Sequence, residues 1–122
     1  MPIMKQKLVQ DFFEAVEVDK LITKGQVDLE TGIFVLRDMI AYVRDDIATM
    51  DKEAYKLLEK EVHQLGEQNK KWKDEQTAKT PEMEDDIDQR NFDRRLLKAD
   101  HQKYKRELLF IQNLVYKKGW FD

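Results

Sequence analysis

The stretch "TPEMEDDIDQRNFDRRLL", from Thr80 to Leu97, decides how this chain folds, because two long helical patterns meet at its start. Thr80 is a good N-cap residue, and Pro81 is favoured in the first turn of a helix. The proline ring also disfavours helical geometry at Thr80, so a preceding helix should end just before it. We therefore predict a turn near residues 78–81, with a long last helix that starts at Pro81.

The stretch is strongly acidic over residues 81–89 and basic afterwards. Its carboxylates are oxygen ligands of the kind that Mg²⁺ or Ca²⁺ takes: Glu82, Glu84, Asp85, Asp86 and Asp88. No glycine supplies an EF-hand turn, and no second acidic motif would complete a coordination sphere. Negative charge is favourable at the N-terminus of a helix. We interpret the run as a helix start and predict no metal site, with carboxylate metal binding kept as an alternative.

Apolar residues on both sides of this corner recur in steps of three and four, as in a heptad seam. The upstream seam is Tyr55, Leu58, Val62, Leu65, Asn69 and Trp72. The downstream seam is Met83, Ile87, Leu97, Tyr104, Leu108, Ile111 and Val115, with Arg90, Arg94 and His101 at the intermediate positions. These patterns predict a long antiparallel helical hairpin over residues 51–118, with Trp72 opposite Ile87 or its neighbours. Gly119 should end the last helix and leave an aromatic tail at residues 119–122.

Residues 1–50 carry two further helical patterns. The first runs from near Ile3 to Lys24, and Gly25 is a natural C-cap. The second begins after Asp28, a good N-cap. We predict an all-α fold: one domain over residues 1–122, a bundle of about four helices, with two short N-terminal helices packed on the half of the hairpin far from its turn.

Composition argues against most enzyme chemistry. The chain has no Cys and no Ser, so the usual nucleophiles are absent, and its four glycines stand alone rather than in phosphate-binding loops. His63 and His101 do not fit the Glu-x-x-His spacing of di-iron bundles, and we expect His101 to face an acidic residue of the third helix. We predict a protein that is not an enzyme and has no cofactor.

Charge and hydropathy predict a cytoplasmic protein that does not enter membranes. The net charge is −3, and no stretch approaches the roughly 20 apolar residues that span a bilayer. Asp11, Glu14 and Glu17 interrupt the N-terminal apolar run, which is not typical of a signal peptide.

The basic stretch "RRLLKADHQKYKR", from Arg94 to Arg106, favours nucleic acid as a second hypothesis. Tyr104 is available there for base stacking. The phosphate-binding residues would be Arg94, Arg95, Lys98, Lys103, Lys105 and Arg106. The alternative interpretation is a salt-bridged helix face, in which Arg90, Arg94 and Lys98 pair with Glu59, Glu61 or Glu67 across the hairpin.

Our leading hypothesis is a non-enzymatic interaction protein that self-associates into a homo-oligomer or docks onto another protein. Trp120 and Phe121 either fold back onto the bundle or stay exposed as a hot spot for a partner. The predicted interface is Tyr55, Leu58, Val62, Leu65, Trp72, Leu97, Tyr104, Leu108, Ile111, Trp120 and Phe121. Small acidic helical chains of this kind occur among bacterial and phage assembly factors, secretion chaperones and inhibitors, which is an analogy of class only.

Overall fold

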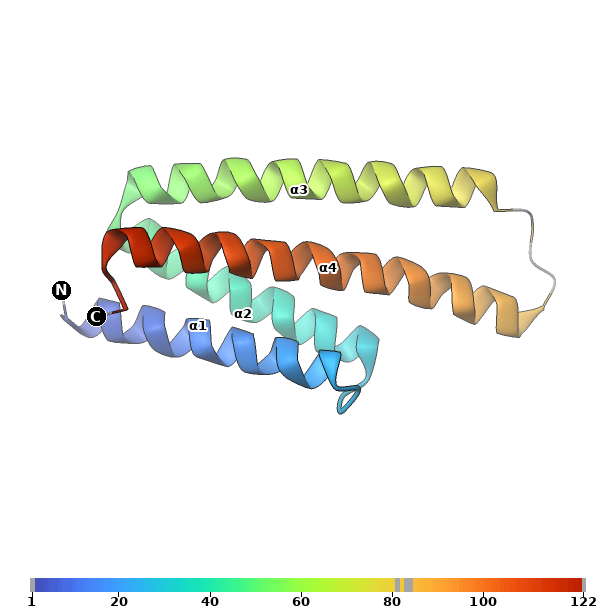
Figure 1. Cartoon of the computed structure of the whole chain (residues 1–122), viewed down its shortest axis with the longest axis horizontal. Helices are drawn as coiled ribbons and strands as arrows, with labels where there is room; N and C mark the ends of the chain where they lie inside the picture. The colour runs from blue at the N-terminus through green and yellow to red at the C-terminus, as the bar shows by residue number, and fades with distance from the viewer. Residues whose placement is uncertain (1, 81, 83–84, 122) are drawn as a thin grey trace.

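The structure, a computed structural model, describes residues 2–80, 82 and 85–121. Figure 1 shows its four helices in these ranges: α1 (Pro2–Thr23), α2 (Leu29–Met50), α3 (Lys52–Lys79) and α4 (Asp86–Lys118). The described ranges contain no strand, so the all-α prediction is confirmed. With 22 residues each, α1 and α2 are about twice as long as an average helix.

Glycines close α1 and α4 in the same way. Gly25 and Gly119 both have a φ of +70°, a left-handed conformation that only glycine adopts without strain. After α1, the N–H of Gly25 donates to the carbonyl of Ile22 and that of Gln26 donates to Leu21, each at 3.0 Å. This pair of bonds is a Schellman motif, which satisfies carbonyls that the helix end leaves open.

Aspartates start three of the four helices. Asp28 caps α2 by accepting a hydrogen bond from the N–H of Thr31 at 3.1 Å, as predicted. Asp51, which the sequence analysis missed, ends α2 and also caps α3 by accepting from the N–H groups of Glu53 and Ala54. An ion pair with Lys118 at 2.8 Å and these N–H bonds hold the pKa of Asp51 below its ordinary value.

The corner between α3 and α4 differs from the prediction. Thr80 ends α3 rather than starting α4, because its hydroxyl donates to the carbonyl of Gln76 at 2.6 Å. The helix α4 begins at Asp86, and its N-cap is Asp85, which accepts from the N–H of Ile87. The predicted helix start at Thr80 is therefore wrong, and Pro81 itself lies outside the described residues.

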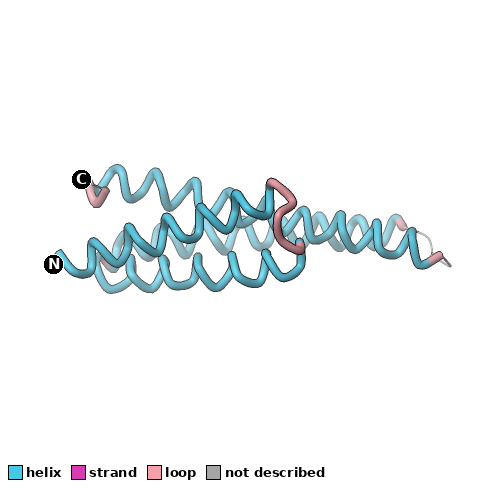
Figure 2. Tube along the Cα trace, turned by 90° about the horizontal axis from the view of Figure 1, so that it is seen from below, coloured by secondary structure: helices cyan, strands magenta, loops and turns pink. Residues whose placement is uncertain are grey.

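The core lies where all four helices run side by side. The helix α2 contacts each of the other three, and its fully buried side chains meet those of α1, α3 and α4. The largest fully buried apolar side chains are Leu8, Leu36, Ile40, Val43, Ile47, Leu58, Ile111 and Val115. Figure 2 shows α3 and α4 continuing past α1 and α2 as a projection of two helices.

The contacts between α1 and α4 are few and specific. The ring of His101 meets Asp19 of α1, with Nε2 2.6 Å from Oδ1, so the acidic partner expected on the third helix lies on the first instead. At the other end Phe121 folds back, and its ring centroid lies 5.1 Å from that of Phe12. Trp120 also packs against the core.

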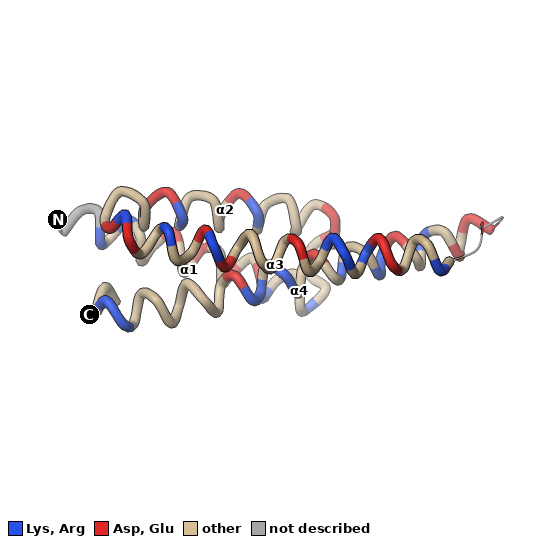
Figure 3. The backbone as a smooth tube through the Cα atoms, turned by 90° about the horizontal axis from the view of Figure 1, so that it is seen from above, with Lys and Arg blue, Asp and Glu red and all other residues tan. Residues whose placement is uncertain are grey.

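None of the described helices has the length and apolar character needed to cross a membrane. Figure 3 shows acidic and basic residues on every helix, and a long stretch of α4 near the C-terminus without either.

Candidate anion-binding groove between α3 and α4

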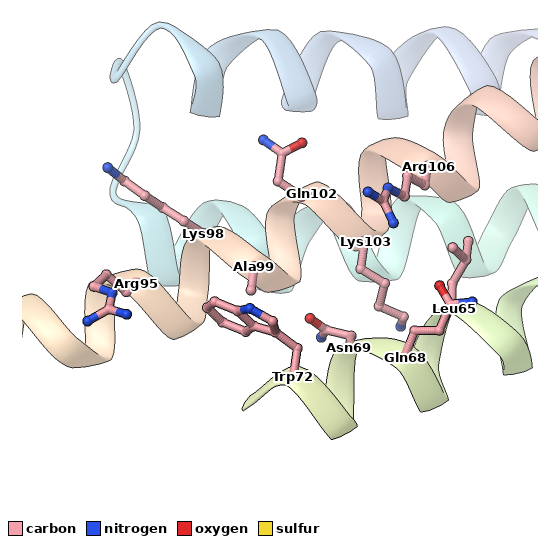
Figure 4. Close-up of a pocket in the computed structure, with 10 residues that line it drawn as sticks. All are labelled: Leu65, Gln68, Asn69, Trp72, Arg95, Lys98, Ala99, Gln102, Lys103 and Arg106. Carbon is pink, nitrogen blue, oxygen red and sulfur yellow. The ribbon is translucent and has the colours of Figure 1, made fainter. Parts of the chain in front are cut away.

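A groove of about 520 Å³ runs between α3 and α4, within the size range of small-ligand sites. Figure 4 shows its lining residues projecting from both helices. The α3 wall consists of Leu65, Gln68, Asn69 and Trp72, and the α4 wall consists of Arg95, Lys98, Ala99, Gln102, Lys103 and Arg106. Spacings of three and four residues place each set on one face of its helix.

The lining contains four cations and no carboxylate. Arg95 donates to the neutral side chain of Gln76 at 3.0 Å. Among the described residues, no carboxylate lies within 4.0 Å of the charged nitrogens of Lys98 or Arg106. Like charges held on one face repel one another, so an anion in this groove would relieve that repulsion.

Two carboxylates close to the groove already have partners, and one of these partners is the groove cation Lys103. Asp100 accepts hydrogen bonds from Asn69 at 2.8 Å and from Lys73 at 2.9 Å. Glu107 lies 3.4 Å from Lys103 and is almost completely buried. Burial raises the pKa of Glu107 above its ordinary value, although the positive charge of Lys103 opposes the rise. Neither carboxylate lines the groove.

Trp72 forms part of the α3 wall, and 38% of its surface is exposed. The α4 side chains beside Trp72 in Figure 4 are Arg95 and Ala99, and not Ile87 or its neighbours as predicted. The reason is the corner: α4 starts at Asp86, so residues further along α4 come opposite α3. The hydrogen bond between Arg95 of α4 and Gln76 of α3 agrees with this register of the two helices.

A second hollow of about 480 Å³ lies on the other side of α4, against the connection between α1 and α2. It shares Lys98 and Gln102 with the groove, so the two hollows adjoin across α4. Its other basic side chains are Arg94 and Lys105, and Lys105 lies 3.6 Å from Asp19.

The structure therefore brings together all six residues predicted to bind phosphate. Arg95, Lys103 and Arg106 line the groove, Arg94 and Lys105 line the second hollow, and Lys98 lines both. The alternative salt-bridged face is not found: within the described ranges, no ion pair joins Arg90, Arg94 or Lys98 to Glu59, Glu61 or Glu67.

Of the eleven residues predicted as a protein interface, four are buried, six are partly buried and one is exposed. Leu58, Leu65, Leu108 and Ile111 are buried, and Leu97 is half-buried. Tyr55, Val62, Tyr104, Trp120 and Phe121 are partly buried against the core, which leaves Trp72 as the exposed member. The seam is used within the chain because α2 and α4 cover it, so in this conformation it offers little surface to a partner.

The acidic run gives no metal site in the part that the structure describes. Asp85 serves as the helix cap, and no three His, Asp or Glu side chains in the described ranges are grouped to hold a metal ion. Glu84 lies outside those ranges.

Sequence reasoning placed Asn69 on the seam with Trp72 but missed the two glutamines of the groove, Gln68 and Gln102. The spacing of Gln68 indicated its position, since it lies four residues before Trp72 and so shares the helix face of Trp72. No known protein family, curated protein or solved structure matches this chain.

Proposed function

We propose that this protein is a non-enzymatic helical protein that binds nucleic acid through the basic surface of α4. The observation that carries the proposal is the groove lining, in which four cations stand beside a tryptophan and no carboxylate is present. Phosphodiester chains supply the repeated negative charge that such a surface would neutralise. The six predicted basic residues support the proposal further, because all of them line one of two adjoining hollows.

The test is a salt titration of binding to oligonucleotides. If Arg95, Lys98, Lys103 and Arg106 each neutralise one phosphate, the plot of log affinity against log salt should have a slope of roughly −3 for a single strand. The double variant Arg95→Glu with Lys98→Glu should lower the affinity at least about tenfold and flatten this slope. Fluorescence anisotropy measures both quantities.

A matched control is the double variant Lys56→Glu with Lys60→Glu, which makes the same change in net charge on an exposed part of α3. Its affinity should stay close to that of the unchanged protein. The proposal fails if no oligonucleotide binds, if binding does not depend on salt, or if both double variants lose affinity equally.

A protein–protein role is the second candidate, and exposed aromatic residues favour it. Phe13 and Tyr116 are 58% and 62% exposed, and both rings contact Phe121, at centroid distances of 5.9 and 5.1 Å. An exposed apolar cluster of this kind is typical of interaction surfaces. Light scattering should then give a mass that rises with concentration, and Tyr116→Lys should return it to the monomer value. A monomer at every concentration would contradict self-association.

A further inference from the structure

The groove places the ring of Trp72 beside the cations of α4, and this arrangement favours one form of nucleic acid over another. Figure 4 shows Trp72 reaching from α3 toward Ala99 of α4, with Arg95 and Asn69 on either side of it. We infer that the groove binds single-stranded nucleic acid, with one base stacked on Trp72 and the neighbouring phosphates on Arg95, Lys98, Lys103 and Arg106. This inference rests on the proposed function and specifies the form of its ligand.

Stacking requires a base whose face is free. Bases of a single strand can turn outward onto an aromatic side chain, and such stacking tolerates every base because each has a π-face. Bases of a duplex are already stacked on both faces, so a duplex offers Trp72 only its edges and phosphates. A partly exposed tryptophan within a basic groove therefore favours the single strand.

The position of α4 also disfavours a duplex. The major groove of B-DNA is about 12 Å wide and admits one helix that stands clear of its neighbours. The basic face of α4 is flanked instead by α3 on one side and by the connection between α1 and α2 on the other. A flexible single strand can follow the hollows between these segments, whereas a rigid duplex needs a helix without such neighbours.

The length of the site suits a few nucleotides. Arg95 and Arg106 are eleven residues apart on one helix, which is on the order of 16 Å along its axis. The amides of Gln68 and Gln102 face the same groove, and each carries both donors and an acceptor for base edges. We therefore expect weak preference among bases and a contact with only a short segment of strand.

The test compares three fluorescein-labelled ligands of equal length, about twelve nucleotides. They are a thymidine oligonucleotide, the same chain with abasic sites throughout, and a duplex of mixed sequence. The full-length protein should bind the thymidine strand more tightly than the abasic strand and the duplex. Trp72→Ala should lower the affinity for the thymidine strand by roughly 5- to 150-fold and leave the abasic strand unchanged. Trp72→Phe should restore most of the loss, since it keeps a ring.

A spectroscopic measurement uses the protein with Trp120→Phe, in which Trp72 is the one remaining tryptophan. Its emission should be quenched on saturation with the thymidine strand and not with the abasic strand.

The outcomes separate the two proposals. Three results would overturn this inference and leave the proposed function standing. They are equal affinity for the thymidine and abasic strands, equal or tighter binding of the duplex, and an equal loss of affinity for every ligand in Trp72→Ala. If none of the three ligands binds with a dependence on salt, both proposals fall together.

Discussion

Asp46 has an unusual environment for a carboxylate, because only 7% of its surface is exposed. One oxygen lies 2.8 Å from the ammonium of Lys7, and the other is buried with no hydrogen-bond donor among the described residues. Burial, together with the neighbouring Asp11, raises the pKa of Asp46 to about 6, although Lys7 opposes the rise. Between pH 3.8 and about 6, Asp46 is mostly protonated in the folded protein, whereas with its ordinary pKa of 3.8 it is mostly ionised in the unfolded chain.

This difference predicts how stability depends on pH. Because the folded state binds the proton more tightly, the contribution of Asp46 to stability is present at low pH and is lost as pH rises from about 4 to about 6. Asp46→Asn should abolish that loss and stabilise the protein at pH 7 by up to about 3 kcal/mol, since one pKa unit corresponds to about 1.4 kcal/mol. Urea unfolding at several pH values measures the effect.

The exposed neighbour Asp45 provides the control for this prediction. The variant Asp45→Asn should leave the shape of the pH curve unchanged. Parallel curves for Asp46→Asn and the unchanged protein between pH 4 and 7 would show that Asp46 does not titrate as described.

At the scale of the elements, two glycines in helices have opposite roles. Gly32 is buried where α2 meets the end of α1, and a Cβ added there would lie 2.7 Å from Cγ1 of Ile22 and 3.0 Å from Cγ2 of Val27. Gly66 of α3 has open space instead, with Cε of Lys103 at 3.9 Å. The first glycine therefore permits close helix packing, whereas the second only weakens its helix.

We expect the same substitution to have opposite signs at the two glycines. Gly32→Ala should destabilise the protein by about 1 kcal/mol or more, since overpacking costs about 1–3 kcal/mol and helix propensity returns less than about 1 kcal/mol. Gly66→Ala should stabilise it by about 0.5–1 kcal/mol. Denaturation midpoints of the two variants test this directly, and changes of the same sign would contradict the packing argument.

Periodicity identified the helices better than it identified which side chains they bury. Leu36, Ile40 and Ile47 are in the core as their spacing indicates, but Phe34 on the same helix is half exposed, and Arg37 lies over its ring at 5.0 Å. The apolar face of α2 is wide, and the sequence does not show how much of that face the neighbouring helices cover.

At the scale of the whole molecule, only a few side-chain contacts join α1 and α4 among the described residues. Asp19 accepts from His101 at 2.6 Å and lies 3.6 Å from Lys105. His101 is buried, so loss of its partner would leave a polar ring without the hydrogen bond that offsets its burial. This contact links residues far apart in the sequence and fixes the side of α4 that faces the second hollow.

A double-mutant cycle with Asp19→Asn and His101→Gln should give a coupling energy of about 1–3 kcal/mol. The exposed pair Lys56 and Glu53, 3.5 Å apart on α3, is the control and should give less than about 0.5 kcal/mol. Equal coupling for the two pairs would mean that the buried contact contributes no more than a surface ion pair.

The candidate site was predictable in part. The basic residues of α4 were visible as a run from Arg94 to Arg106, and the structure gathers all of them into two hollows. The other wall was not predictable, because Trp72 was assigned to a seam opposite Ile87. Which residues of α3 face the basic run depends on the length of the corner, and that corner was assigned too few residues.

The sequence by itself determined the helices and most of their ends. Steps of three and four place apolar residues on one face, and Asp28, Gly25 and Gly119 act through contacts within a few residues, so no distant partner is needed. Only the tertiary structure decided the register of α3 against α4, the partner of His101 and the burial of the predicted interface. A heptad seam repeats, so one helix can slide along another and still match apolar residues. The number of residues between α3 and α4 and the packing of both helices against α2 choose among these positions, and that choice places Trp72 beside the cations of α4.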